Sequence, residues 1–194
     1  MKRDADAIPA FAGHETTVPR RPSRPTLIHP LLTAKIQRML IDAELAAFIE
    51  SPVMIIVGTC DDTLLPQIAR AVGAIVDSAK TRIDLVVSGW QWPDTVANVR
   101  RNGRLSVTFA RPSDYVSFQV KGRATVKPAS AAHRAGAENY IGAMTATLVG
   151  NGLDRAVIAP WLVDREPMAL RLAAEMIFVQ TPGDKAGQIL GASR

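Results

Sequence analysis

The stretch that decides the fold is IDLVVSGWQWPDTVANVRRNGRLSVTF at residues 83–109, followed by YVSFQVKGRATV at residues 115–126. Its first residues are apolar and β-branched, which is typical of a buried strand. Asp94 or Thr95 can then cap a short helix. This helix ends at residues 102–103, because Asn and Gly both tolerate the left-handed conformation of a helix C-terminus.

Two more strands are predicted after the short helix. Apolar and polar residues alternate over residues 105–109 and again over residues 115–126, and this period of two is typical of half-buried strands. Residues 110–114 form the turn between them. The order strand, short helix, strand, hairpin, strand is uncommon, and it indicates a particular kind of barrel.

The preceding part of the chain predicts two helices and a pair of strands. Apolar residues at helical spacing predict a helix at residues 31–41, and Asp42 can cap a second helix at residues 43–50. A continuous apolar run at residues 53–57 predicts a strand buried on both faces, and residues 68–76 return as its partner. The helix faces consist of Leu32, Ile36, Met39 and Leu40, and of Leu45, Phe48 and Ile49.

The last third of the chain combines helix and strand. Residues 129–148 are rich in Ala and lack proline, so they predict one helix or two, whereas residues 160–167 are expected to be irregular. Residues 168–179 predict a long strand that closes a barrel or packs on a partner. One face of this strand would carry Met168, Leu170, Leu172, Ala174, Met176 and Phe178, and the other would carry Arg171 and Glu175.

The charge of the chain is concentrated in one region. The 194 residues are 47% hydrophobic, enough for one core, and carry a formal charge of +5. Residues 100–123 contain six cations and Asp114 as their one acid, so the excess is local. It indicates an anionic ligand or surface nearby, or else a solvated basic face. The one cysteine, Cys60, excludes an internal disulfide and favours a reducing, cytoplasmic location.

The N-terminal segment does not have the pattern of a signal peptide. Residues 1–30 contain five prolines and no apolar run, so a flexible arm is expected there, with the barrel domain at residues 31–194. The basic residues at 20–25 fit a nucleic-acid-binding arm, but a flexible tail or one that packs on a partner is favoured, and no function is assigned to them. Since no eighteen-residue apolar stretch occurs, no membrane partner is expected.

Few catalytic motifs are found in the sequence. The dinucleotide-binding, P-loop and hydrolase-elbow patterns are lacking, and Cys60 has no CxxC partner. The three histidines, His14, His29 and His133, are isolated in the sequence, so no metal site is expected. Trp90 and Trp92 flank a strand end, where aromatic rings stack on a planar ligand or cap the core; packing in the core is favoured.

Several stretches together resemble one known family. They are residues 51–52 before the first strand, Pro66-x-x-x-Arg70, DTVANVRRNGR at residues 94–104, and QVKGRA at residues 119–124. In this order and spacing they resemble the pyridoxamine 5′-phosphate oxidase-like family of flavin-binding split β-barrels. The resemblance covers about residues 31–126 and the last strand with its polar end. It implies an α+β split barrel with peripheral helices, and a homodimer that holds FMN at the subunit interface.

The resemblance also suggests which residues face the cofactor. Arg70 is similar to the arginine beside the flavin phosphate, and Gln119 to the glutamine that approaches the flavin. Asp94 and Thr95 stand where two phosphate-binding cations are found in the oxidases, and Ile75 stands where a lysine holds the substrate. FMN binding without pyridoxamine phosphate oxidation is therefore expected. The expected cofactor-binding residues are Arg70, Ala71, Val72, Ser88, Trp90, Thr95, Gln119 and Lys121; no catalytic residue is assigned.

Three hypotheses about function remain open at this point. The first is an FMN-dependent oxidoreductase acting on a small organic substrate. The second is a non-catalytic split barrel in a stress or carrier role, which binds haem, another flavin or nothing. The third, a nucleic-acid-binding small barrel, is suggested by the basic stretch. With 5% aromatic residues a stacking surface is disfavoured, so no nucleic-acid partner is expected.

Overall fold

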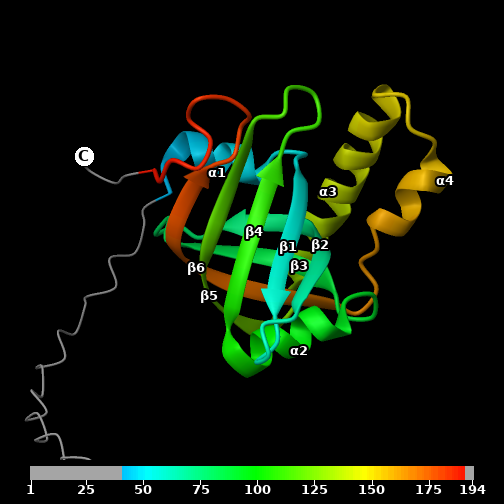
Figure 1. The fold of residues 1–194 in the computed structure, drawn as a ribbon. Helices are drawn as coiled ribbons and strands as arrows, with labels where there is room; N and C mark the ends of the chain where they lie inside the picture. The colour runs from blue at the N-terminus through cyan, green and yellow to red at the C-terminus, as the bar shows by residue number, and fades with distance from the viewer. Residues whose placement is uncertain (1–40, 191–194) are drawn as a thin grey trace, which may run out of the picture. The chain divides into compact units, whose positions relative to one another are not determined.

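The computed structural model describes residues 41–190, in which six strands form a closed antiparallel barrel (Figure 1). The predicted helix at residues 31–41 and the expected boundary after residue 30 lie outside this part, apart from Ile41, which is not helical. The barrel order is β1 (Met54–Cys60), β2 (Pro66–Val76), β3 (Arg82–Ser88), β6 (Pro167–Val179), β5 (Ser117–Pro128) and β4 (Arg104–Ala110).

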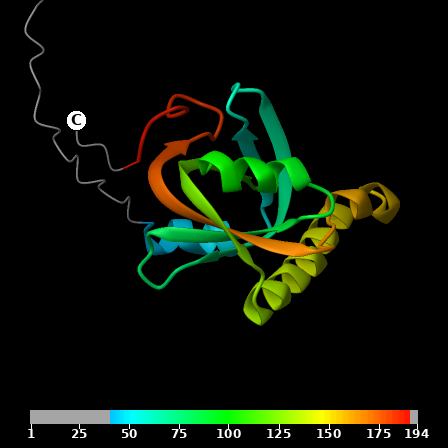
Figure 2. The ribbon, with the colours of Figure 1, turned by 90° about the horizontal axis from the view of Figure 1, so that it is seen from below.

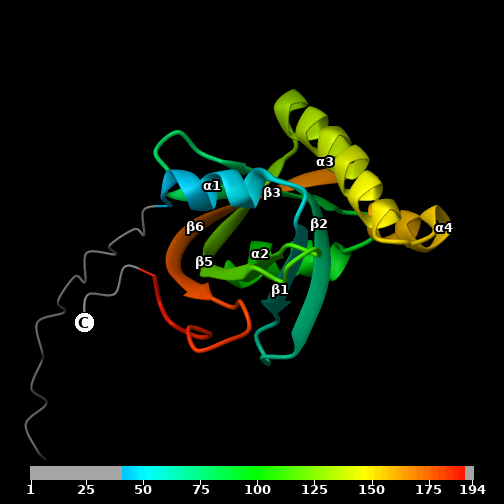
Figure 3. The same ribbon diagram turned by 90° about the horizontal axis from the view of Figure 1, so that it is seen from above.

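Helices close the two ends of the barrel. Helix α1 (Ala43–Glu50) lies across one end (Figure 3), and α2 (Pro93–Asn102) lies across the other (Figure 2). The prediction for α1 is confirmed, because Asp42 Oδ1 accepts a hydrogen bond from the Leu45 N–H at 2.7 Å. Its apolar face of Leu45, Phe48 and Ile49 is buried.

Helix α2 ends as predicted but begins earlier. Gly103 follows it with φ 67°, and its N–H donates to the Val99 carbonyl. The N-cap position belongs to Trp92, and the first helical residue is Pro93, whose fixed φ suits that position. The prediction that Asp94 or Thr95 caps the helix is therefore wrong, since both lie within its first turn.

The outer side of β1 is not buried. Ile55 and Val57 point into the core, whereas alternate residues such as Ile56 are half-buried on the outside. The prediction of a strand buried on both faces is wrong, because no helix of the described residues lies over this side of the sheet (Figure 1). The uninterrupted apolar run thus leaves an apolar strip on the barrel surface.

The long strand β6 contains a β-bulge that the sequence pattern did not predict. Lys121 pairs with Met176 and Gly122 with Ala174, so Glu175 is left without a cross-strand partner. The extra residue reverses the alternation beyond it. Met176 is 40% exposed and Ile177 is buried, so the predicted single face from Met168 to Phe178 is wrong beyond Ala174.

The bulge also explains the glycine opposite it. A Cβ on Gly122 would lie 1.9 Å from the Ala173 carbonyl oxygen, closer than any side chain tolerates. Glycine is therefore required where β5 approaches β6 most closely.

The remaining helices cover one flank of the barrel. The prediction of one helix or two at residues 129–148 is confirmed as the single helix α3 (Ala131–Gly150), which begins after its N-cap Ser130 and is followed by α4 (Arg155–Ile158) and η1 (Ala159–Trp161). Helix α3 is joined to the segment just before β1 by the Tyr140 hydroxyl, which donates to the Val53 carbonyl at 2.7 Å. Burial raises the pKa of Tyr140, so this donor stays protonated. Within residues 41–190, no helix has the length and hydropathy needed to cross a membrane.

Candidate functional site

The outer surface of β1, β4 and β5 and of the first half of β2, here called the open face, holds three of the expected cofactor-binding residues. One row of cross-strand neighbours runs over it, from Arg70 through Ile56 and Thr108 to Gln119. These four side chains are half-buried and alternate with inward residues. Arg70 and Gln119 therefore lie level with each other, three strand spacings or about 14 Å apart along the sheet.

Arg70 is a half-buried cation without an acidic partner. Its guanidinium lies 5.0 Å above the Trp161 ring of η1, and Nη1 is 3.9 Å from Met54 Sδ. Among residues 41–190, no carboxylate forms a salt bridge with it. Such a cation is suited to an anionic ligand, because a charge partner would compensate its partial desolvation.

The other two residues on the open face lie on β5. The Gln119 Nε2 group donates to Thr108 Oγ1 at 3.2 Å, and Lys121 Nζ lies 4.8 Å above the Phe178 ring. Lys121 is one row further along the strand than Gln119. Both side chains are thus held in place by neighbouring strands, with polar atoms directed towards the surface.

The remaining five expected residues lie elsewhere. Ala71 and Val72 are buried in β2, and Ser88 uses its hydroxyl twice, donating to the Arg165 carbonyl at 2.7 Å and accepting from the Gln91 N–H at 3.1 Å. Thr95 is 2% exposed. One chain alone therefore does not gather the eight residues around one cavity, and their roles in binding stay predictions.

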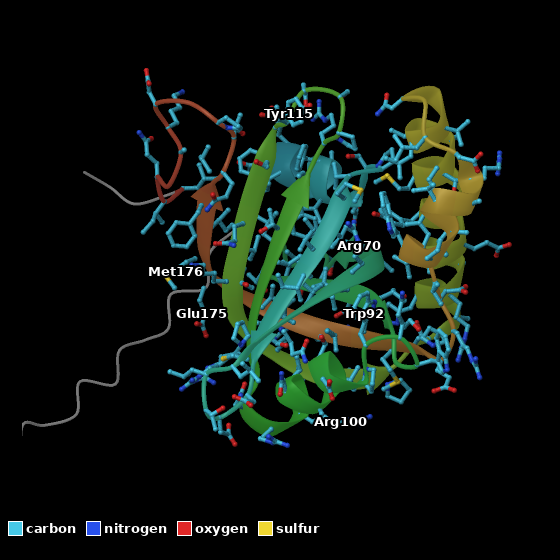
Figure 4. All side chains as sticks on the ribbon, turned by 45° about the vertical axis from the view of Figure 1, so that its right-hand side comes forward. Arg70, Trp92, Arg100, Tyr115, Glu175 and Met176 are labelled. Atoms are coloured by element: carbon cyan, nitrogen blue, oxygen red, sulfur yellow. The ribbon has the colours of Figure 1, made fainter. Side chains whose placement is uncertain are left out.

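Trp90 and Trp92 differ in their surroundings. Trp92 packs against the core, as expected, whereas Trp90 is 51% exposed and its ring lies 4.6 Å from the Arg165 guanidinium carbon. Core packing is therefore wrong for Trp90, whose ring lies at the surface beside Arg165. Figure 4 shows Trp92 on the same flank of the barrel as Arg70.

The start of α2 fits a phosphate only in part. No side chain in the described part of the chain caps this helix, which leaves its first N–H groups open. The neighbouring Asp94 carboxylate is exposed and accepts from Gln67 Nε2 at 3.4 Å. It therefore points towards β2, yet it still adds a negative charge where a phosphate would need a positive one.

The sequence did not predict a buried acceptor in the connection between β3 and α2 that has no hydrogen-bond partner among the described residues. The Gln91 Nε2 group donates to the Pro160 carbonyl at 2.8 Å, and its Oε1 is buried without a hydrogen-bond partner within residues 41–190. A buried acceptor of this kind is costly unless a donor reaches it. No sequence pattern would have shown this, since the burial depends on η1.

Sequence reasoning also missed a groove of about 490 Å³ at the α2 end of the open face. It is lined by Arg104, Lys121 and Arg123, with Ile68 and Met176 among its apolar residues. The signal in the sequence was the local excess of cations between residues 100 and 123. Figure 4 shows Met176 and Glu175 on the opposite side of the open face from Arg70.

A larger cavity of about 740 Å³ lies at the other end of the barrel, between α1 and the β4–β5 turn. Phe48 and Phe118 line it, together with Leu190, the last residue described. None of the eight expected cofactor-binding residues lines this cavity. It is therefore not the candidate site, although it is the larger one.

Asp84 connects β3, β6 and α3 away from the open face. Its carboxylate accepts from Arg171 Nε at 2.7 Å and Nη2 at 2.5 Å, and His133 Nε2 lies 3.1 Å from Oδ2. Burial opposes the negative charge, but the hydrogen bonds from Arg171 and His133 outweigh it and hold the pKa of Asp84 below its ordinary value.

The hydrogen bonds of His133 decide whether its ring nitrogens are free to bind a metal ion or haem. Its Nδ1 accepts from the Ser130 N–H at 3.0 Å while Nε2 faces Asp84, so both ring nitrogens are engaged. Within residues 41–190, no three His, Cys, Asp or Glu side chains gather as metal ligands. His14 and His29 lie outside the described residues.

The fold defines a class of protein: an α+β split barrel, closed by six antiparallel strands, with helices at both ends and on one flank. No protein-family model and no curated protein matches the sequence. Solved structures do match. One is HupZ from Group A Streptococcus, at 17% identity over 76% of this chain and 100% of that chain, with a TM-score of 0.48.

Two further matches are to proteins of the kind that the sequence resembles. A putative pyridoxamine 5′-phosphate oxidase from Lactobacillus delbrueckii has 11% identity over 72% of this chain and 94% of its own, with a TM-score of 0.46. General Stress Protein 26 from Bacillus anthracis has 11% identity over 70% and 90%, with a TM-score of 0.42. At such low similarity, nothing about ligand or activity passes from these proteins to this chain.

Proposed function

We propose that the chain forms a homodimer through the open face and binds FMN there, as an oxidoreductase for a small organic substrate. The observation that carries this proposal is the half-buried Arg70, a cation without an acidic partner among the described residues, level with Gln119 on the same surface. The cytoplasmic location expected from Cys60 belongs to the same proposal.

A two-fold axis along the strands would complete the site. If the axis passes over the middle of the row, it places Gln119 of the partner subunit opposite Arg70. It also places Arg70 of the partner subunit opposite Gln119. The apolar strip around Ile56 would be covered at the same time. An obligate dimer of this kind buries roughly 2,000 Å² or more in total, and the apolar strip around Ile56 favours such an interface.

In such a dimer, Arg70 and Gln119 would bind different parts of FMN. Arg70 would neutralise an anionic group of FMN, and the partner's Gln119 would donate to or accept from the ring edge. Bound FMN would supply the electron and hydride transfer, so the chain needs no conspicuous catalytic side chain. Asp94 and Thr95 provide no cation, so Arg70 carries a large share of the attraction.

The test is FMN binding by the full chain, followed through the quenching of flavin fluorescence. Arg70→Ala removes a charge-assisted contact worth roughly 1.5–3 kcal/mol, so affinity should fall about ten- to a hundredfold. Arg101→Ala is the matched control, because Arg101 lies on α2 and faces Asp62 at 4.0 Å. Equal affinity of Arg70→Ala and the parent would refute the site.

Two further measurements address the cofactor and the assembly. Mass analysis of any cofactor released from the purified protein should identify FMN, whereas haem or another flavin would overturn that part of the proposal. Sedimentation should show a dimer at micromolar concentration. A stable folded monomer under the same conditions would contradict the shared site.

A further inference from the structure

We infer that the groove at the α2 end of the open face, one row beyond Gln119 and sharing Lys121 with the expected cofactor-binding residues, is a second binding site for a small phosphate-bearing ligand, of the nucleoside diphosphate class. The groove, of about 490 Å³, has the size of ordinary small-molecule sites. Arg104, Lys121 and Arg123 line it against the single acid Glu175, which gives a net charge of 3 − 1 = +2.

Two arginines of the groove lie so close together that their like charges repel each other. Arg104 and Arg123 are direct cross-strand partners on β4 and β5, so their Cβ atoms are about 4.5–5.5 Å apart. Like charges directly opposite each other in a sheet are destabilising. An anion between the two guanidinium groups turns this repulsion into shared attraction, with the bidentate geometry that arginine offers to phosphate.

These cations are not neutralised by the rest of the described chain. Within residues 41–190, none of Arg104, Lys121 and Arg123 has a carboxylate within 4.0 Å, including the carboxylate of Glu175. Arg123 Nη1 donates to the Asn102 carbonyl at the end of α2 at 2.6 Å, which holds that side chain in position. Its other N–H groups have no recorded acceptor in residues 41–190, so they are available to a ligand.

The floor of the groove lets a ligand approach the sheet. Gly58 has no side chain there, and Ser106, the cross-strand neighbour of Lys121, adds a hydroxyl. At Gly58 a Cβ would lie 2.8 Å from the Ser106 oxygen, so even a methyl group would crowd this hydroxyl. Phosphate oxygens can therefore reach both hydroxyl and cations at the sheet surface.

Apolar side chains at the two ends of the groove, on β2 and β6, explain the choice of a nucleoside over a bare anion. Ile68 is 67% exposed and Met176 is 40% exposed, and both line the groove. At either end, the adaptable methionine or the exposed isoleucine suits the flat apolar body of a nucleoside whose phosphates reach the cations between them. A long nucleic acid fits less well, because Glu175 stands in the groove and no aromatic side chain of the described residues lines it for stacking.

The experiment is calorimetric titration of the full chain with ADP, pyrophosphate and adenosine, at low and at physiological salt. We expect ADP to bind more tightly than pyrophosphate and adenosine not to bind measurably. Arg104→Gln and Lys121→Gln should each weaken ADP about ten- to a hundredfold. Arg101→Gln is the control on the adjacent helix and should leave ADP affinity unchanged.

Thermal unfolding with and without ADP provides a second readout. Without ligand, Arg104→Gln should unfold at the same temperature as the parent or slightly above it, because repulsion across the strands is relieved. ADP should raise the unfolding temperature of the parent and not that of Arg104→Gln. A lowered unfolding temperature of Arg104→Gln without ligand would overturn the inferred repulsion.

The outcomes separate this site from the FMN proposal. ADP binding should persist in Arg70→Ala, and FMN binding should persist in Arg104→Gln. The inference is overturned if ADP binds the double variant R104Q/K121Q as it binds the parent, or if ADP fails to bind the parent at millimolar concentration. It is also overturned if single-stranded DNA binds more tightly than ADP with the same dependence on Arg104.

Discussion

Asp84 is the buried carboxylate that joins β3, β6 and α3, and replacing it with asparagine tests how these elements are held together. The substitution Asp84→Asn keeps the size of the side chain and removes its charge. Arg171 then loses two charge-assisted hydrogen bonds, and His133 loses its negatively charged partner. The effect should appear as a smaller free energy of unfolding.

The magnitude follows from the surroundings of the pair. Breaking a fully buried ion pair costs about 3–5 kcal/mol, but the Arg171 side chain is 36% exposed and water partly compensates it. We therefore expect a loss of roughly 1.5–3 kcal/mol, the range for hydrogen bonds to charged groups. For a chain of this size the unfolding temperature should fall by about 3–12 °C.

The effect should depend on pH in a defined direction. The pKa of Asp84 is lowered in the folded protein, so its stabilisation is fully present above the ordinary pKa of about 3.9. It is lost as the pH falls through the lower folded value. The difference between parent and Asp84→Asn should therefore be largest near neutral pH and should shrink below about pH 4.

Urea denaturation at several pH values measures this difference. Asp114→Asn is the matched control, because Asp114 pairs with Arg111 at 3.1 Å on the surface, with both side chains 43% exposed. The free energy of unfolding of Asp114→Asn should be at most about 1 kcal/mol smaller than that of the parent. Equal stability of Asp84→Asn and the parent at pH 7, or a difference that grows on acidification, would refute the reasoning.

Two other predictions concern the bulge and the substrate. Gly122→Ala should lose about 3 kcal/mol in urea denaturation, because its Cβ would lie 1.9 Å from the Ala173 carbonyl oxygen. Gly142→Ala within α3, where a new Cβ meets nothing within 4 Å, should instead gain about 0.5–1 kcal/mol. Flavin-loaded protein should not oxidise pyridoxamine 5′-phosphate, because Ile75 provides no cation and packs on α3, where a Cβ on Gly136 would lie 3.6 Å from Ile75 Cδ1. Turnover of about 10 per second in an oxygen-coupled assay would contradict this last prediction.

The sequence alone determined the features that depend on near neighbours. The Asp42 cap of α1, the left-handed Gly103 after α2, and the alternation in β4 all follow from residues within about one turn of each other. Such signals survive in any tertiary context, because hydrogen bonds within one turn or along one strand enforce them. The resemblance in motif order added the barrel class, which the strand pairing confirms.

Only the tertiary structure decided what depends on register. The bulge at Glu175 turns Met176 to the surface, although the alternation of residues 168–179 predicted the opposite face. The row that sets Arg70 level with Gln119, and the pairing of Arg104 with Arg123, arise from strands that are distant in sequence. Register is fixed by the closure of the whole barrel, and no local pattern of residues records it.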